Sequence, residues 1–358
     1  MYVIRPFITY RAIEINADAT TIGLIGAIYA LFPVLLALKF GSLVGRFGEG
    51  KFLVFGTLSL ITSCVSFLFA NDVFTLAITT ALAGLSHLAL MVGGQTMVAL
   101  RAAKSDYNRL FGYYTFSASL GHTFGPVIAG LLAGSLANGL PKDSNRAFLF
   151  AVVLSTIALI PTFNWKNHEP TIKAAQDQSN TWAATKSMLS RKEISLAIFI
   201  SLAVSTTIDL LVIFLPLLGK ERLIEPSVIG LIISLRAVGS MGSRLLLGRV
   251  SASVSDRSLL LSTNGITMLA CIGMVYFQNP IILALLVFVA GFMSGFGQPL
   301  TMALISKRTK ADERALAVSA RLTGNRLGQF LLPIFAGLLA TGAGVGAVFW
   351  ADRKSTRL

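Results

Sequence analysis

Charged residues are scarce in this sequence: Asp, Glu, Lys and Arg make up only 13% of its 358 residues, whereas a soluble protein has about a quarter. Hydrophobic residues make up 54% of the chain, and the mean hydropathy is +0.74. These values exclude an ordinary water-soluble domain and predict a protein that is embedded in a membrane.

Cysteine is also nearly absent. Cys64 and Cys271 both lie in apolar blocks, where cysteine behaves as a small hydrophobic side chain. Two isolated cysteines exclude a disulfide framework and a cysteine-based metal site. No His, Asp or Glu cluster has the spacing of metal ligands, and no nucleophile is grouped with a base. We therefore predict that the protein is not an enzyme and binds no cofactor.

Long apolar runs are abundant. A helix that crosses the hydrocarbon needs about 20 mostly apolar residues. Ten such blocks are present, at 21–40, 52–70, 73–100, 110–137, 147–163, 194–218, 227–248, 258–277, 280–306 and 315–341. The sequence thus predicts an all-α integral membrane protein with many spans.

The net charge of +14 has a topological explanation. Sixteen Lys and Arg residues lie in alternate connections, at 42–51, 101–109, 164–193, 249–257 and 306–314. Five lie in the opposite set, at 11–20, 71–74, 137–146, 218–226 and 277–280. Such a bias places the basic connections in the cytoplasm. We expect a multi-pass protein of the inner (plasma) membrane whose partner is the lipid bilayer, and no nucleic-acid partner.

Both ends of the sequence resemble interrupted helices. Residues 1–13 are too short to cross the membrane, and the apolar run at 344–351 stops at the heptapeptide 352–358. That heptapeptide resembles a translated sequencing adapter, so we interpret it as a non-native tail; a genuine basic tail is the alternative. Ten full helices and two partial ones indicate a twelve-helix protein.

A repeat relates the two halves of the chain. Residues 117–134 and 324–341 are identical at eight of eighteen positions, at an offset of 207. The same offset relates 22–24 to 229–231. An offset of six helices, an even number, leaves both copies in the same orientation across the membrane. We therefore predict two parallel halves, 1–163 and 194–351, joined by a cytoplasmic linker at 164–193.

Proline and glycine recur within the repeat. Gly121, Pro126 and Gly130 return as Gly328, Pro333 and Gly337. A proline inside a helix removes a backbone hydrogen bond, and small residues, here including Gly125, let a second helix backbone approach. Their presence in both halves favours a bend at a moving interface between the halves over a static packing kink.

These features resemble the major facilitator superfamily of secondary transporters over residues 1–351. GHTFGPVIAG, residues 121–130, resembles the fifth-helix or antiporter motif of that family. GSLVGRFGEGK, residues 41–51, resembles the motif between helices 2 and 3 and matches it at Gly41, Arg46 and Gly48. The usual acidic residue is replaced by Gly45, so the cytoplasmic lock of the family does not carry over to this chain. RLTGNRLGQ, residues 321–329, resembles a bacterial subgroup of mostly unassigned substrate.

The resemblance implies an MFS fold of two parallel six-helix bundles, a form of repeat known from this family, with remnants of helices 1 and 12. It also implies a monomeric, proton-coupled transporter of a small organic molecule that works by alternating access. The antiporter-like motif favours efflux. An uptake permease of the same fold and a non-transporting membrane sensor or scaffold are the alternatives.

Ionisable residues inside the apolar blocks mark the expected substrate and proton pathway, because a charge at mid-membrane costs at least about 2.5–3.5 kcal/mol. Asp209 and Arg236 lie at similar depths, and Arg5 reaches a similar level. We expect an Asp209–Arg236 pair, with a role in transport or as a structural ion pair. Arg326 lies near the midplane, and His122 lies beside Pro126.

Asp209 is the only acidic residue well inside a complete block, whereas several arginines are. This balance favours an anionic or polar substrate over a bulky cation. Arg321 and Arg244 lie nearer the cytoplasmic ends and are expected at the membrane interface. Arg321 and Arg326 are expected on different helix faces. Further candidates for the cavity are Gln95, Tyr113 and Tyr114. His87 and His122 are lone histidines that could titrate near neutral pH, and the alternative is that each is an interior histidine with satisfied hydrogen bonds.

Overall fold

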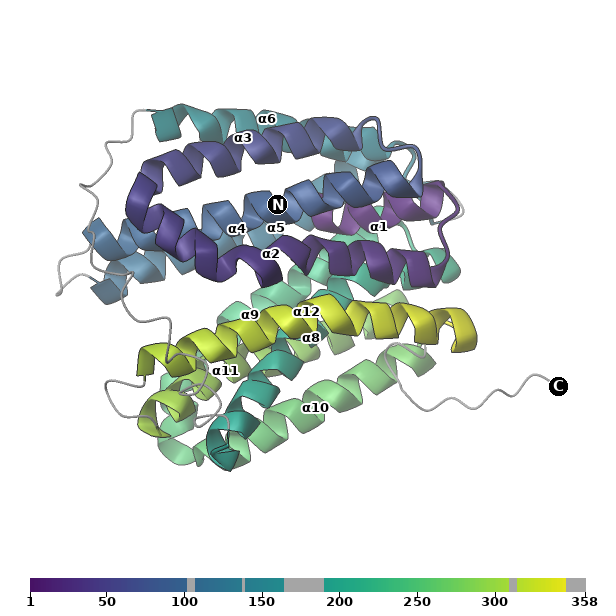
Figure 1. Ribbon diagram of the computed structural model, residues 1–358. Coiled ribbons are helices and arrows are strands. Elements are labelled where there is room, and N and C mark those ends of the chain that lie inside the picture. The colour runs from purple at the N-terminus through teal and green to yellow at the C-terminus, as the bar shows by residue number, and fades with distance from the viewer. Residues whose placement is uncertain (102–106, 137–138, 164–189, 309–313, 346–358) are drawn as a thin grey trace.

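The computed structural model describes residues 1–101, 107–136, 139–163, 190–308 and 314–345, and the account below concerns these residues (Figure 1). The regular secondary structure of these residues is α-helical. The helices are α1 (Ile4–Glu14), α2 (Ala19–Phe47), α3 (Glu49–Phe67), α4 (Val73–Arg101), α5 (Tyr107–Ala133), α6 (Ser144–Phe163), α8 (Lys192–Glu221), α9 (Pro226–Ser253), α10 (Asp256–Tyr276), α11 (Pro280–Arg308) and α12 (Arg314–Ala343).

Each of the ten predicted blocks is one helix, and the all-α membrane fold is confirmed. Eight of these helices, within the described ranges, are long and apolar enough to cross a membrane. Several helices extend past the apolar block, because intrahelical hydrogen bonds satisfy the backbone equally well in the polar interface. The predicted tail at 352–358 lies outside the described residues, and so does most of the apolar run before it.

The end of α2 differs from the prediction. The apolar block 21–40 predicts a helix that ends next to Gly41, but α2 runs on to Phe47. Gly248, the residue 207 positions after Gly41, likewise lies within α9. The break comes at Gly48, which has φ 88° and ψ 150° and is the one residue between α2 and α3. Glycine is the residue that adopts this conformation without steric cost. Arg46 lies in the last turn of α2, and its side chain is outside the described part of the structure.

The 207-residue offset holds for the helices as well as for the sequence. Three pairs of helices begin 207 residues apart, namely α2 and α9, α3 and α10, and α4 and α11. The described parts of α5 and α12 are helical over residues related by the same offset. In addition, α1 corresponds to the last eleven residues of α8, 211–221. The repeat read from the sequence is therefore a repeat of structure.

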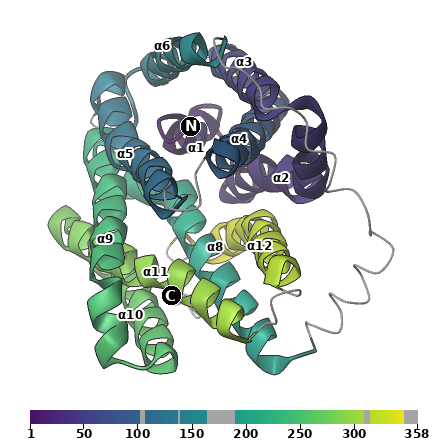
Figure 2. The same ribbon diagram turned by 90° about the vertical axis from the view of Figure 1, so that its left-hand side faces the viewer.

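The helices form two bundles. Figure 1 shows α1 to α6, the N-terminal bundle, above α8 to α12, the C-terminal bundle. Where the bundles meet, α2 packs against α12, α5 against α9 and α1 against α8. Figure 2 shows these contacts from the side of the basic connections, which we call the inner side; the other is the outer side.

Part of the repeated motif lies at the contacts between the bundles, namely Pro126, Gly130, Pro333 and Gly337. The prediction of an interface role is wrong for Gly121, Gly125 and Gly328, which pack against residues of their own bundles. A methyl group built on Gly230 of α9 would lie 2.9 Å from the Pro126 carbonyl carbon of α5, and one on Gly23 of α2 would lie 2.9 Å from Gly337 Cα of α12. Because Gly23 and Gly230 are equivalent positions, the contacts repeat with approximate two-fold symmetry. This arrangement explains why both halves contain the same motif.

The shared hydrophobic core lies on the outer side. One large cluster of buried side chains joins the two bundles through the outer halves of α1, α2, α5, α8, α9 and α12. On the inner side, the described residues form three small clusters, each within a single bundle. The bundles are therefore closed against each other on the outer side, and the described residues form no such common core on the inner side.

Candidate functional site

A cavity of about 770 Å³ lies between the two bundles near the middle of the membrane. Helices α1, α2, α4 and α5 contribute residues to its walls from one bundle, and α8, α9, α11 and α12 contribute residues from the other. The shared core separates this cavity from the outer side. A cavity of this size accommodates a small organic molecule.

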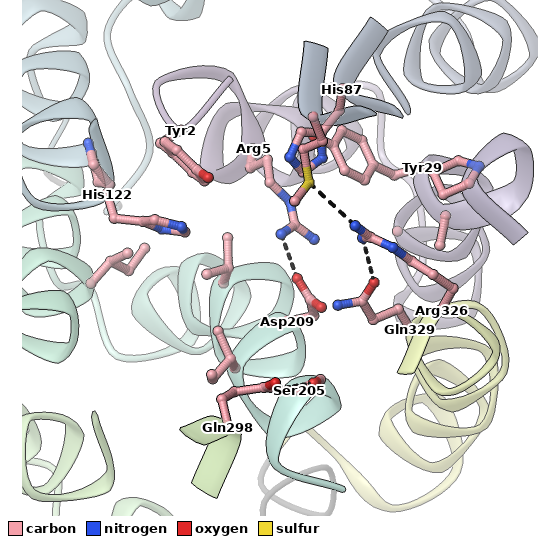
Figure 3. Close-up of a pocket in the computed structure, with 18 of the residues that line it drawn as sticks. Tyr2, Arg5, Tyr29, His87, His122, Ser205, Asp209, Gln298, Arg326 and Gln329 are labelled. Atoms are coloured by element: carbon pink, nitrogen blue, oxygen red, sulfur yellow. Dashed lines mark hydrogen bonds and ion pairs between the residues drawn. The ribbon is translucent and has the colours of Figure 1, made fainter. Parts of the chain in front are cut away.

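Arg5 and Asp209 form an ion pair that joins the bundles at the centre of the cavity (Figure 3). Asp209 is 4% exposed, and the Arg5 guanidinium also lies 4.7 Å from the ring centre of Tyr29. Arg236, which the sequence predicted as the partner of Asp209, does not form this ion pair. Both arginines lie at a suitable depth, but α1 brings Arg5 to the cavity face of α8, and helix adjacency cannot be derived from depth alone.

Arg326 borders the cavity on the opposite side from Arg5 (Figure 3). Its Nη1 donates to Gln329 Oε1 at 2.9 Å, and its Nη2 lies 3.3 Å from Met91 Sδ of the other bundle. Neither partner is charged. This position in the cavity wall agrees with the prediction that Arg326 faces the interior of the protein near the midplane.

Arg321 also borders the cavity, and the prediction that it reaches the membrane interface is wrong. Its side chain is buried and donates to Ser201 Oγ at 3.0 Å and to Gln298 Oε1 at 2.8 Å. These polar groups on α8 and α11 hold the guanidinium inside the bundle. Although five residues apart, Arg321 and Arg326 both border the cavity.

Aromatic side chains form part of the wall. His122 and Tyr2 lie with ring centres 3.4 Å apart, and His87 and Tyr29 with ring centres 5.7 Å apart. Arg236 is not among the residues that line the cavity. It is 4% exposed, and its Nε has no hydrogen-bond partner among the described residues.

The structure therefore brings Asp209, Arg5, Arg326 and His122 together and places Pro126 in the same wall. Arg244, His87 and Gln95 border the cavity as well, whereas the Tyr113 side chain is outside the described part. Sequence reasoning missed the wall residues Tyr2, Tyr29, Met91, Ser205, Gln298 and Gln329. The two glutamines were detectable as polar residues in apolar spans; nothing in the pattern distinguishes Tyr29 from an ordinary membrane aromatic residue.

The chain matches one family model along nearly its whole length. The model, described as the Major Facilitator Superfamily, matches residues 1–223 and 194–352. Structures of known transporters share the fold. A nucleoside transporter, NupG, superposes with a TM-score of 0.77 at 12% identity, over 98% of this chain and 94% of that chain. A bacterial homologue of the human lysosomal transporter Spinster, in an inward-facing and unoccupied conformation, gives 0.72 at 13% identity, over 95% and 81%.

Curated relatives are matched over shorter stretches. The class H tetracycline resistance protein of Pasteurella multocida is 27% identical over 157 residues, which is 44% of this chain and 37% of that protein. Multidrug resistance protein 1 of Bacillus subtilis (strain 168) is 30% identical over 158 residues, which is 44% and 40% respectively. The match thus spans about two fifths of the length of each of these relatives.

Proposed function

The chain belongs to the major facilitator superfamily, and from that premise we propose that it is a proton-coupled secondary transporter of a small organic molecule. The family and the fold are those of transporters rather than enzymes. The observation that carries the proposal is the central cavity, which is walled by both bundles and closed on one side by their shared core.

This geometry supports a mechanism of alternating access. The contacts that close the outer side run through helix pairs related by the repeat, α2 with α12 and α5 with α9. A rocking motion that separates these contacts, and brings the inner ends together, exposes the same cavity to the other side of the membrane. The bend motifs at Pro126 and Pro333 lie in the interface that this motion must break.

Asp209 is our candidate for the proton carrier. Among the described residues that border the cavity it is the one carboxylate, and its partner Arg5 belongs to the other bundle. Protonation of Asp209 removes the negative charge that holds Arg5, so proton binding and bundle separation are coupled through one ion pair. Ionisable groups at this depth in a membrane protein are commonly proton relays.

Efflux is the proposed direction, and the similarity to a tetracycline resistance protein and a multidrug resistance protein supports it. Uptake uses the same fold under a different gradient, so the direction has to be measured. We propose that the transporter acts as a monomer, because the two bundles of one chain together form the walls of the cavity.

Reconstitution of the full chain into lipid vesicles tests the function. A proton gradient imposed across the vesicle membrane should drive flux of at least one compound from a panel of small organic molecules, and a pH-sensitive dye should report the accompanying proton movement. The direction of the proton gradient that makes the compound accumulate inside the vesicles distinguishes efflux from uptake. Binding of compounds without any flux in either direction would instead support a sensor and contradict the transporter.

A further inference from the structure

We propose that the cavity recognises an organic anion, whose negative group binds between Arg5 and Arg326 and displaces Asp209 from Arg5. This inference rests on the proposed function, because the cavity is taken as the substrate site. It goes further by naming the chemical class of the substrate and the residues that hold it.

The first support is the charge of the cavity. Arg5, Arg244, Arg321 and Arg326 border it, and Asp209 is the one carboxylate among its described wall residues. The ion pair offsets the charge of Arg5. Arg244 is exposed and Arg321 donates to two neutral side chains, so Arg326 is the half-buried arginine with the weakest partners. Removing a charge from water costs several kcal/mol unless an opposite charge or hydrogen bonds compensate. An anionic ligand supplies that compensation, whereas a cationic ligand adds to the repulsion.

The second support is the state of Arg326. The partners of its two terminal nitrogens are a neutral amide oxygen and a thioether sulfur, and a thioether is a weak acceptor. A carboxylate or phosphate oxygen forms a shorter, charge-assisted hydrogen bond with a guanidinium. Arg326 thus gains more from an anion than it loses by releasing Met91.

The third support is the position of Arg5. Figure 3 shows the guanidinium groups of Arg5 and Arg326 approaching the same space from opposite sides, with Asp209 next to Arg5. Because Arg5 lies in α1 and Asp209 in α8, an anion that takes over Arg5 also weakens the bond between the bundles. Substrate and Asp209 then compete for one guanidinium.

The aromatic wall favours an anion with a flat, apolar body. Tyr29 lies under the Arg5 guanidinium, and the Tyr2–His122 pair borders the other side of the cavity. Such rings pack against apolar and aromatic surfaces, so the charged group of the substrate binds the arginines while its body lies along these rings.

Three probes that share one ring test the class on the unaltered full chain. Benzoate, benzamide and benzylamine differ mainly in head group and charge, and their binding to the purified protein is measured by calorimetry without any proton gradient. We expect benzoate to bind at millimolar concentration and the other two to bind at least tenfold more weakly, a difference of about 1.4 kcal/mol. Absence of benzoate binding, or equal binding of benzamide or benzylamine, would overturn the inference.

Two variants test the site with opposite expected signs. Arg326→Gln should weaken benzoate binding about tenfold, because a charge-assisted hydrogen bond is lost. Asp209→Asn should strengthen it severalfold, because the competitor for Arg5 is removed. A matched control is Arg146→Gln, since Arg146 pairs with Asp143 at the exposed outer surface; it should leave binding unchanged. Parallel weakening by Arg326→Gln and Asp209→Asn would contradict the exchange.

The inference and the proposed function fail in different ways. Flux of neutral or cationic compounds, with no binding of benzoate, would refute the anion site and leave the transporter. Binding of benzoate with the two expected variant effects, but no proton-driven flux of any compound, would refute the transporter and leave the anion site. The probe comparison uses no variant, so it decides the class even if a variant fails to fold.

Discussion

The carboxylate of Asp209 links the two bundles and, in our account, carries the proton. Asp209→Asn should abolish proton-driven flux in vesicles, since the amide takes up no proton in the working range, while exchange of substrate without a gradient persists. The measurement is the ratio of gradient-driven flux to substrate exchange in the same vesicles. Proton-driven flux that survives in the variant would remove Asp209 from this role.

A matched control for that variant is Asp72→Asn. Asp72 lies in the outer connection before α4 and accepts a hydrogen bond from the Thr75 backbone at 2.9 Å, and this bond lowers the pKa of its carboxyl group. Asparagine caps a helix about as well as aspartate does. The control therefore makes the same chemical change outside the cavity, and coupled flux should be retained.

Gly48 provides a test of local structure. Its φ of 88° with ψ of 150° is a conformation that costs other residues about 1–3 kcal/mol. Gly48→Ala should therefore lower the melting temperature of the purified protein. Gly265→Ala is the control, because that helical glycine has nothing within 4 Å of an added methyl group. Equal melting temperatures for the two variants would contradict the assigned backbone strain.

Single residues also show where sequence reasoning stops. The depths of Asp209, Arg236 and Arg5 follow from the helical rise, and all three are correctly placed inside the protein. Which arginine reaches the carboxylate depends on how α1, α8 and α9 pack, and a hydropathy pattern contains no such information. Arg321 was misjudged for the same reason, because its partners Ser201 and Gln298 come from other helices.

At the scale of the helix, the packing of glycine against proline defines the outer contact. Alanine at Gly23 or Gly230 would bring its methyl group within 2.9 Å of the facing backbone, and a backbone cannot move aside as a flexible side chain can. Each variant should therefore separate the bundles on the outer side, and the repeat predicts the same direction of change for both.

Spin labels at Asn71→Cys and Gln278→Cys report this separation, since both positions are exposed in the outer connections of different bundles. We expect a longer distance to become populated in Gly23→Ala and in Gly230→Ala. The Gly265→Ala control should keep the original distribution. A distribution that is unchanged in both interface variants would show that these contacts do not close the outer side.

Helix positions were the most predictable feature of the molecule. Membrane thickness fixes the length of an apolar run, so each of the ten blocks corresponds to one helix. The ends were less predictable, as the extension of α2 through Gly41 to Phe47 shows, because a helix does not stop where the hydrocarbon stops. The repeat was visible because the glycines and prolines of the interface leave little freedom for substitution.

At the scale of the whole molecule, the two bundles are closed on the outer side by a core that both share, and the cavity lies inward of it. The sequence predicted two like-oriented halves, but not which side is closed. Which side is closed depends on the difference in free energy between the contacts on the outer side and those on the inner side. In a transporter this difference must be small enough to be reversed during the transport cycle.

A disulfide across the outer contact tests the central claim, that these two bundles must part on the outer side during transport. The Thr20 and Thr341 hydroxyl oxygens, in α2 and α12, lie 2.7 Å apart, so cysteines at these positions can bridge. The measurement is proton-driven flux by Thr20→Cys/Thr341→Cys in a background with Cys64 and Cys271 replaced by alanine. We predict that oxidation stops flux and that a reductant restores it; undiminished flux through the fully cross-linked protein would contradict the account.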